Sequence, residues 1–289
     1  MDDDILASQF EANRKHLKKI AFRMLGSRTD AEDAVQEAWL RLSRSDTDEI
    51  RSLGGWLTTV VARVCLDVLR SRRLRREDQV EFKALESVVD LREGSDPEFD
   101  VALADTVGLA LLVVLETLAP AERVAFVLHD LFDLSFEEIA PILDKSPAAA
   151  RKLASRARGR FRGTPRVPKP DLMQRRGVVD AYLAAARDGD FEGLLAVLDP
   201  SVVLRADRPM MPGAPRLEIR GADLVARQAL TGRTDAAVPM LVDGMPGIAV
   251  APGGRLLLAL KVLIVNGRVT EIDVVVDPSR LQRLKLAVL

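Results

Sequence analysis

Apolar residues in the first quarter of the chain recur with a helical period. Ile5 to Leu25 is amphipathic and ends at Gly26, and a longer amphipathic stretch runs from about Gly55 to Arg76. Between them lies the segment DAEDAVQEAWLRL, for which Asp30 is the expected N-cap. Its apolar face consists of Ala31, Val35, Ala38 and Leu42. The pattern predicts a helical module over residues 1–76.

A second helical module is predicted over residues 101–163. Ser135 and Glu138 form a capping box, in which the serine and the glutamate satisfy backbone groups at the start of one helix. Pro141 should bend or shorten that helix. Ser146 and Pro147 then supply a cap followed by proline at the first helical position. Two short helices joined near Asp144 fit a helix-turn-helix.

The pattern becomes mixed after the proline-rich stretch 164–170, which predicts a domain boundary. We expect helices over about 171–198 and 222–231, and a hairpin turn at Asn266-Gly267. The expected strands are Val202–Ala206, Ala237–Asp243, Leu256–Val265 and Arg268–Val276. Residues 171–289 are therefore predicted to form an α+β domain.

Charge is concentrated although the 289 residues carry a formal net charge of only −1. The segments Arg70–Arg76 (RSRRLRR) and Arg151–Arg162 (RKLASRARGRFR) are strongly basic, and Glu77–Asp105 between them is acidic. Two separate basic blocks suit two contacts with DNA better than one diffuse patch.

The segment from Ser146 to Arg162 divides into an apolar and a basic face. A four-residue spacing predicts that Ala149, Leu153, Ala157 and Phe161 face the core. The opposite side would expose Arg151, Lys152, Ser155, Arg156, Arg158 and Arg162. Small residues at a helix start followed by long cations are typical of a recognition helix in the major groove. The alternative is a solvated basic face without a ligand.

The helix that ends in RSRRLRR is a second candidate DNA contact. Trp56 lies at its start, and the exposed flank would carry Arg63, Arg70, Arg72, Arg73, Arg75 and Arg76. A cationic helix with an aromatic residue can stack an unpaired base, at about 1–3 kcal/mol per base. Core packing is the alternative role for Trp56, and Trp39 is also expected near the core.

The strings DAEDAVQEAWLRL, GGWLTTVVARVCLDVLRSRRLRRE and LAPAERVAFVLHDLFDLSFEEIAPILDKSPAAARKLASRARGRFR resemble regions 2 and 4 of extracytoplasmic-function (ECF) sigma factors. The tail, with GADLVARQALTG, VDGMPGIAV and DPSRLQRL, resembles a SnoaL-like domain. The resemblance implies a multidomain chain with two all-α sigma domains and a C-terminal α+β cone on a curved mixed sheet. Its parts are region 2 (1–76), an acidic linker (77–100), region 4 (101–163), a proline-rich linker (164–170) and the regulatory tail (171–289).

The resemblance also implies roles for residues in a factor that directs RNA polymerase to promoters. Contacts with the clamp helices of the polymerase β′ subunit would come from Asp33, Gln36, Glu37 and Leu40. The promoter −10 element would be read by Trp56, Arg63, Asp67, Arg70, Arg72 and Arg73. The −35 element would be read by Ser146, Pro147, Ala148, Arg151, Lys152, Ser155, Arg156 and Arg158.

The chain lacks several motifs that are usual in ECF sigma factors with a SnoaL-like tail. A Trp-Leu-Pro-Glu-Pro string is missing between Glu77 and Asp100, the Asp-Gly-Gly-Gly-Lys motif keeps only Asp207, and Asn-Pro-Asp-Lys-Leu is replaced by Asp277-Pro-Ser-Arg-Leu281. Regulation through those motifs is therefore in question, while the sigma function is not.

Candidate pocket residues of the tail are Tyr182, Asp207 and Asp273. A buried carboxylate could serve an isomerase or cyclase, but both histidines precede residue 164. We therefore expect no catalytic residue, and a small-molecule sensor or an intramolecular clamp instead.

Other features exclude whole classes. The single cysteine excludes a disulfide framework, no cofactor motif or metal site is expected, and the acidic N-terminus lacks a signal core. No apolar run is long enough to span a membrane, so a cytoplasmic protein is expected. The remaining alternative for the whole chain is a helix-turn-helix repressor or activator that binds duplex DNA without polymerase.

Overall fold

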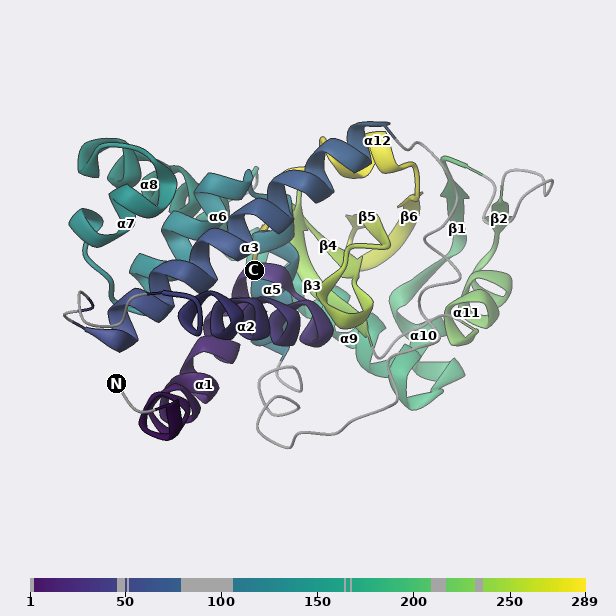
Figure 1. Cartoon of the computed structure of the whole chain (residues 1–289). Coiled ribbons are helices and arrows are strands. Elements are labelled where there is room, and N and C mark those ends of the chain that lie inside the picture. Colours follow the sequence, from purple (N-terminus) through teal and green to yellow (C-terminus); the bar gives the residue numbers. More distant parts are fainter. Residues whose placement is uncertain are drawn as a thin grey trace. The chain divides into compact units, whose positions relative to one another are not determined.

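The computed structural model describes residues 3–45, 50, 52–78, 106–163, 165–166, 168–208, 217–231 and 236–289. The expected acidic linker from residue 79 onward and the side chains of Arg75 and Arg76 lie outside the described residues. The chain forms two compact units (Figure 1). One comprises residues 1–81 and 118–159, and the other comprises residues 82–117 and 160–289.

The first unit is entirely helical. Its elements are α1 (Asp3–Leu25), α2 (Arg28–Leu42), α3 (Leu53–Asp78), α6 (Pro120–Phe126), the π-helix η3 (Val127–Leu131), α7 (Phe136–Leu143) and α8 (Pro147–Arg162), of which α8 continues past residue 159 into the second unit. Helices α1, α2 and α3 pack together around fully buried side chains such as Leu17, Ala38 and Leu57. The helical class predicted for this part of the chain is confirmed by these three helices.

The start of α2 differs from the prediction. Ser27, and not Asp30, is the N-cap, because its Oγ accepts a hydrogen bond from the backbone N–H of Asp30 at 3.3 Å. Asp30 lies inside the first turn, where its negative charge favours the helix N-terminus. Serine three residues before an acidic residue was the sequence signal for this cap.

Local caps build the helix-turn-helix as predicted. The Ser135 backbone N–H donates to Glu138 Oε2 at 2.9 Å, and Ser135 Oγ accepts from the Glu138 N–H at 3.3 Å. Helix α7 contains Pro141 and ends at Asp144, whose φ of 54° is left-handed. Ser146 Oγ then accepts from the Ala149 N–H at 3.3 Å at the start of α8.

The buried face of α8 differs from the predicted one. Ala150, Ala154 and Ala157 are buried, whereas Ala149 and Leu153 are only half-buried. A strict four-residue spacing turns by 400° per step, so it drifts about 40° around a helix of 3.6 residues per turn. The mixed spacing of four and three residues keeps the alanines on one face.

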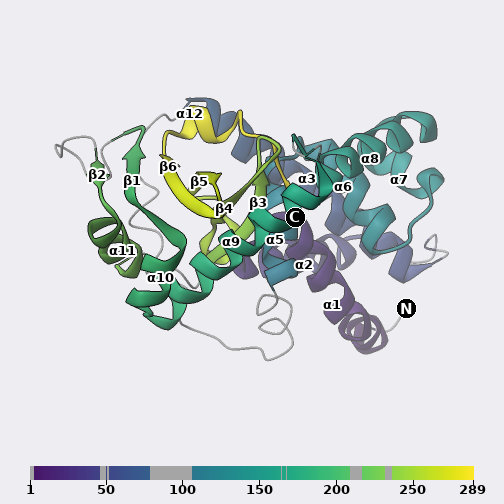
Figure 2. The same ribbon diagram turned by 180° about the vertical axis from the view of Figure 1, so that it is seen from behind.

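The second unit surrounds one seven-stranded mixed sheet of order β2-β1-β6-β5-β4-β3-β7 (Figure 2). The strands are β1 (Leu198–Ala206), β2 (Glu218–Arg220), β3 (Ala237–Val242), β4 (Met245–Val250), β5 (Leu258–Val265), β6 (Arg268–Val275) and β7 (Leu286–Val288). The other elements are α5 (Thr106–Thr117), α9 (Lys169–Asp188), α10 (Phe191–Val197), α11 (Ala222–Leu230), the 3₁₀ turn η5 (Pro252–Gly254) and α12 (Pro278–Leu281). Strands β1 and β6 are parallel, and the other pairs are antiparallel. The predicted α+β class is confirmed.

Two hairpins use the same turn chemistry, and the sequence prediction found only one. Asn266 and Gly267 have φ of 52° and 77° between β5 and β6, as predicted. Asp243 and Gly244, with φ of 53° and 82°, likewise join β3 to β4. An Asp-Gly pair was the available signal for this hairpin, although a proline such as Pro246 is uncommon inside a strand. The short strands β2 and β7 were missed as well.

The predicted helix over 171–198 is wrong because the chain breaks at Gly189. This glycine caps α9 with a φ of 71°. Asp190 then caps α10 by accepting the Gly193 N–H at 2.9 Å. The remaining residues join β1, which begins at Leu198 and not at Val202.

Helices cover both faces of the sheet. Helices α9, α10 and α11 pack over one apolar cluster that includes Ile248 and Val262. The opposite face of β3, β4 and β7 packs against α5 through a second cluster that includes Val113 and Met240. A short helix, α12, adds Leu281 next to Ala259 and Val275. Helix α5 falls inside the segment expected to be region 4, yet it packs on the sheet of the tail.

Candidate DNA and polymerase interfaces

Helix α8 exposes the basic face predicted from the sequence. Its exposed candidates are Pro147, Ala148, Arg151, Lys152, Ser155 and Arg156, together with the cap residue Ser146. The first turn carries only small side chains, and no acidic residue lies within α8. Among the described residues, none pairs with the side chains of Lys152 or Arg156. These cations are available to phosphates.

Two arginines of α8 are engaged by the rest of the first unit. The Arg151 guanidinium lies 5.2 Å from the ring centroid of Phe136, which orients it without neutralising its charge. Arg158 donates to Asp130 Oδ1 at 3.0 Å and is half-buried. Of the residues predicted to read the −35 element, Arg158 is therefore the one whose side chain is held by an ion pair within the described part of the protein.

A π-helix places Asp130 in front of α8. The segment Val127–Leu131 widens the end of α6 by one residue per turn, and such widenings occur often at functional sites. Within it, His129 Nδ1 lies 2.9 Å from the carbonyl oxygen of Leu134, and its ring lies 4.0 Å from that of Phe136. Asp130 follows directly and reaches Arg158. Sequence periodicity gave no indication of this contact.

Four of the candidates on helix α3 share one exposed or half-exposed stripe. At 100° per residue, Trp56, Arg63, Asp67 and Arg70 fall within about 60° of one another. Arg63, Asp67 and Arg70 are exposed, and Trp56 is half-buried at the first turn. Leu74 continues the stripe and is 63% exposed. An aromatic ring, two arginines and an exposed leucine on one line form a surface suited to unstacked bases.

Arg72 lies on the opposite side of α3 and serves the fold. It forms an ion pair with Asp30 and donates to the carbonyl oxygen of Leu25 at 3.1 Å. That carbonyl belongs to the last turn of α1, where a helix leaves acceptors without helical partners. The structure therefore separates Arg72 from the other candidates of α3, although Arg73 beside it is exposed.

Arg63 connects α3 to the helix-turn-helix within the first unit. Its guanidinium donates to the carbonyl oxygen of Pro141 at 3.0 Å. This carbonyl belongs to the last turn of α7, so the cation also complements the negative end of that helix. Nearby on α1, the His16 ring meets the Phe132 ring edge-on at 5.5 Å. Arg63, which was predicted to contact the −10 element, thus forms a hydrogen bond with the helix-turn-helix, which was predicted to bind the −35 element.

The candidates on α2 form one exposed face. Asp33, Gln36, Glu37 and Leu40 follow each other at spacings of three, one and three residues. Asp33 and Gln36 are exposed, and Leu40 is 41% exposed although it is apolar. Glu37 accepts from Arg41 at 2.8 Å. Trp39 instead packs on Phe10, with the ring centroids 4.9 Å apart, as expected for a core residue.

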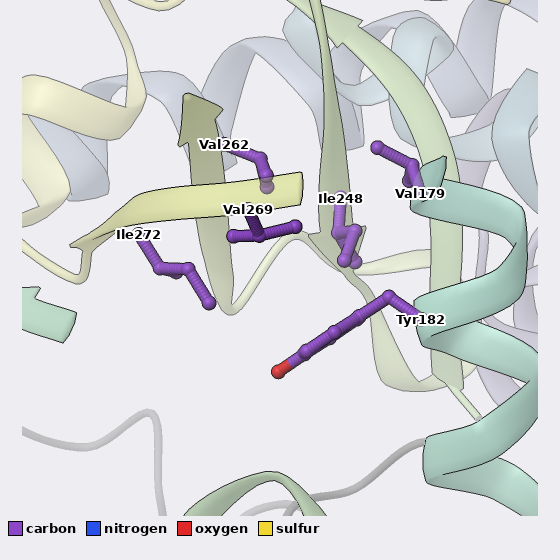
Figure 3. Close-up of a pocket in the computed structure, with 6 residues that line it drawn as sticks. All are labelled: Val179, Tyr182, Ile248, Val262, Val269 and Ile272. Carbon is purple, nitrogen blue, oxygen red and sulfur yellow. The ribbon is translucent and has the colours of Figure 1, made fainter. Parts of the chain in front are cut away.

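The tail contains a small apolar pocket that is closed to water-sized molecules in this structure. It is lined by Val179, Tyr182, Ile248, Val262, Val269 and Ile272. Figure 3 shows the Tyr182 side chain extending from α9 toward the strand residues. Burial raises the pKa of the Tyr182 hydroxyl to about 12, and none of the described residues forms a hydrogen bond with it.

The two candidate carboxylates of the tail lie elsewhere. Asp207 Oδ1 accepts the backbone N–H groups of Val276 (2.9 Å) and Asp277 (3.2 Å), and Oδ2 pairs with Arg280 at 3.0 Å. Asp207 therefore fixes the turn between β6 and α12. Asp273 is exposed because it alternates with the pocket residue Ile272 along β6. The structure does not bring the three candidates together.

Two basic helices, one of them in a helix-turn-helix, together with an exposed acidic and apolar face on α2, are features of the transcription-factor class. Family models agree, since residues 9–75 match Sigma-70 region 2 and residues 108–161 match Sigma-70, region 4. The chain is 35% identical over 285 residues to the probable ECF RNA polymerase sigma factor SigI of Mycobacterium tuberculosis, covering 98% of this chain and 97% of SigI. The chain belongs to the ECF RNA polymerase sigma factors.

Two further comparisons concern SigJ of Mycobacterium tuberculosis. The ECF RNA polymerase sigma factor SigJ is 44% identical over 223 residues, which cover 76% of this chain and 70% of SigJ. Its crystal structure aligns with a TM-score of 0.47 and 33% identity, over 95% of this chain and 97% of that chain. Sigma factors bind core RNA polymerase and promoter DNA and are not enzymes. Among the described residues, no helix has the length and apolar character needed to cross a membrane.

Proposed function

We propose that this sigma factor reads its promoter with two faces, the stripe of α3 and the exposed cations of α8, while α2 holds the polymerase. The observation that carries the proposal is the exposure of Arg151, Lys152 and Arg156 on α8 beside a first turn of small residues. The factor would act in the cytoplasm, where promoter DNA and polymerase are found.

At the −35 element, the N-terminal turn of α8 enters the major groove. Pro147 and Ala148 are small enough to let the backbone approach base edges. Arg151 and Arg156 then reach guanine edges or phosphates, and Lys152 neutralises phosphates. Each neutralised phosphate releases counterions, so duplex binding weakens as salt rises.

At the −10 element, the stripe of α3 captures an opened strand. Trp56 stacks on an unpaired base, and Arg63 and Arg70 hold the backbone. Unstacking a base costs a few kcal/mol, which stacking on Trp56 and the phosphate contacts offset. Arg63 uses one nitrogen for the Pro141 carbonyl, so its remaining N–H groups can donate to a phosphate.

The face of α2 is the proposed polymerase contact. Leu40 supplies an apolar centre, and Asp33, Gln36 and Glu37 surround it with polar and negative groups. An apolar residue inside a polar rim is typical of a protein interface. Leu40→Asp should weaken association with core polymerase at least tenfold, whereas Glu11→Gln on α1 should not.

Run-off transcription with core polymerase tests the proposal as a whole. Specific starts that require this protein are expected on promoters taken upstream of its dependent transcripts. Duplex binding without initiation would instead favour a helix-turn-helix repressor, and it would contradict the proposal.

We also propose that the tail modulates initiation and that its pocket takes a small apolar ligand with one polar group. Five aliphatic side chains and the Tyr182 side chain line the pocket. The pocket has no room for a water molecule in this structure, so a ligand must move these side chains apart to enter. No carboxylate lines the described pocket, which argues against an isomerase or cyclase.

Indole and toluene are suitable probes for the pocket. Indole should raise the melting temperature of the wild type more than that of Tyr182→Phe, which keeps the shape and loses the hydroxyl, whereas toluene should stabilise both equally. Equal responses of the two proteins to indole would contradict a role for the hydroxyl.

A further inference from the structure

The sheet of the tail holds the first helix of region 4. Leu109, Val113 and Val114 of α5 enter one apolar cluster with the strands. Their partners in the sheet and after it are Val238, Met240, Val242, Ala249, Ala251 and Leu286. Side chains alternate between the two faces along a strand, so these residues lie on the face opposite to the one that α9 covers.

Polar and steric contacts fix the position of α5. The backbone N–H of Leu256 donates to Glu116 Oε2 at 2.5 Å. Gly254 in η5 faces Leu112, and a β-carbon there would lie 3.1 Å from that side chain. Gly254 also has a φ of 83°, which favours glycine. The turn between β4 and β5 is therefore shaped to receive α5.

The same sheet holds the far end of α8. Phe161 packs against the cluster that contains Val113 and Met240. Arg160 donates to the carbonyl oxygen of Thr117 at 2.8 Å, which ties the end of α8 to the end of α5. Gly163 follows with a φ of 56°, and a β-carbon there would lie 2.5 Å from the β-carbon of Ala287 in β7.

We infer that the tail controls −35 recognition by holding region 4 at both of its ends. The region 4 match spans residues 108–161, and its first helix and its last residues both contact the same sheet face. The recognition helix α8 leads directly into that contact. This inference rests on the proposed function and names the contact through which the tail acts.

The pocket and the region 4 contact share a strand. Ile248 of β4 lines the pocket, and its neighbour Ala249 points to the opposite face, toward the α5 cluster. A change in the position of β4 therefore reaches both faces. Occupation of the pocket has a direct physical route to α5.

A double-mutant cycle in the full-length chain tests the inference. Val113→Ala and Met240→Ala each remove buried methyl or methylene groups from the shared cluster, and we expect each to weaken binding to a −35 duplex. Since both variants damage one contact, the double variant should lose less affinity than the product of the single losses, by roughly threefold or more. Fluorescence anisotropy measures the affinity, and circular dichroism confirms that each variant is folded.

Leu194→Ala and Val202→Ala are the matched controls. Both residues are fully buried, in the cluster on the other face of the sheet. These variants should melt at lower temperature and yet bind the −35 duplex like the wild type when folded. Binding to core polymerase should be unchanged in all four single variants, because α2 is remote in sequence and function.

The outcomes separate the inference from the proposed function. Wild-type initiation together with unchanged −35 binding of Val113→Ala and Met240→Ala would overturn the inference alone. Equal losses in the control pair would also overturn it, because the effect would then be general destabilisation. A wild type that binds neither duplex nor polymerase would overturn both.

Discussion

Helices α3 and α8 are both rich in arginine, but the fold uses their arginines differently. On α3, Arg63 bonds to the last turn of α7, and Arg72 bonds to Asp30 and the last turn of α1. On α8, Lys152 and Arg156 are exposed, and Arg158 is the one member of the predicted −35 set with a described ion pair. Helix α3 uses two of its arginines to stabilise the fold. Helix α8 instead leaves most of its cations exposed, where they can contact DNA.

A run of arginines therefore has no single structural or functional role. Position around the helix decides the role, because Arg72 lies about 180° from Arg63 on α3. The carbonyls at a helix C-terminus attract cations as DNA phosphates do. Substitutions can therefore separate arginines that bind DNA from arginines that support the fold.

The largest effect is expected from the triple variant Arg151→Ala, Lys152→Ala, Arg156→Ala. Removal of base-reading and phosphate-binding cations should cost about 2–6 kcal/mol of −35 binding and reduce the salt slope by about one unit per lost phosphate contact. Titrations at several salt concentrations measure both. Arg176→Ala, on the exposed surface of α9, is the control, and an unchanged slope in the triple variant would contradict the role of α8.

Arg72→Ala should act on stability more than on DNA. Loss of the Asp30 pair and of the bond to the Leu25 carbonyl should lower the free energy of unfolding by about 1–2 kcal/mol. Arg70→Ala should have little effect on stability and should weaken binding to a single-stranded −10 oligonucleotide. Denaturant titration and anisotropy distinguish the two, and the reverse assignment would refute the separation of the two faces.

Ser135→Ala removes the N-cap of α7, the helix that precedes α8. The free energy of unfolding should fall by about 1 kcal/mol, the usual contribution of an N-cap. Hydrogen bonds from the Ser135 hydroxyl and backbone hold the pKa of Glu138 below its ordinary value of 4.5. A carboxyl group whose pKa is lowered on folding stabilises the folded protein at pH values above its ordinary pKa. That stabilisation is lost as the pH falls through the pKa of the folded state. Unfolding of the wild type should therefore become easier in that acidic range, and Ser135→Ala should show a flatter dependence. The same dependence in both proteins would contradict this.

The smallest effect is expected from Asp130→Ala. Removal of a partly exposed ion pair changes stability by about 0–1 kcal/mol. Arg158 is then free to approach phosphate, so −35 affinity should rise by a few fold at low salt. Glu137→Gln, which removes an exposed negative charge on α7, controls for the general change in charge, and a loss of affinity in Asp130→Ala alone would mean that the pair positions α8.

Sequence reasoning performed best where the signal is local. The capping box at Ser135, the cap at Ser146 and the Asn266-Gly267 hairpin depend on residues within four positions of one another, and all three were predicted. The family resemblance of the two basic segments was also carried by continuous strings. The failures at Ser27, Gly189 and Asp243-Gly244 had local signals as well. At Ser27, the nearby Asp30 was an equally suitable cap residue.

Contacts between distant segments were not predictable in this way. Nothing in the sequence around Arg63 indicates Pro141, and nothing around Val113 indicates Met240, because hydrophobic periodicity identifies a buried face without its partner. Asp207 was a reasonable candidate for a pocket, yet its role at the β6–α12 turn depends on strand pairing.

Residue type and spacing along single segments were enough to specify most of the helices, the caps at Ser135 and Ser146, the family and the exposed basic face of α8. The tertiary structure alone decided which arginines remain free for DNA, which tail residues share a pocket, and that α5 of region 4 packs on the sheet of the tail. The physical reason is that burial and pairing are settled between segments far apart in the chain, by which surfaces exclude water together.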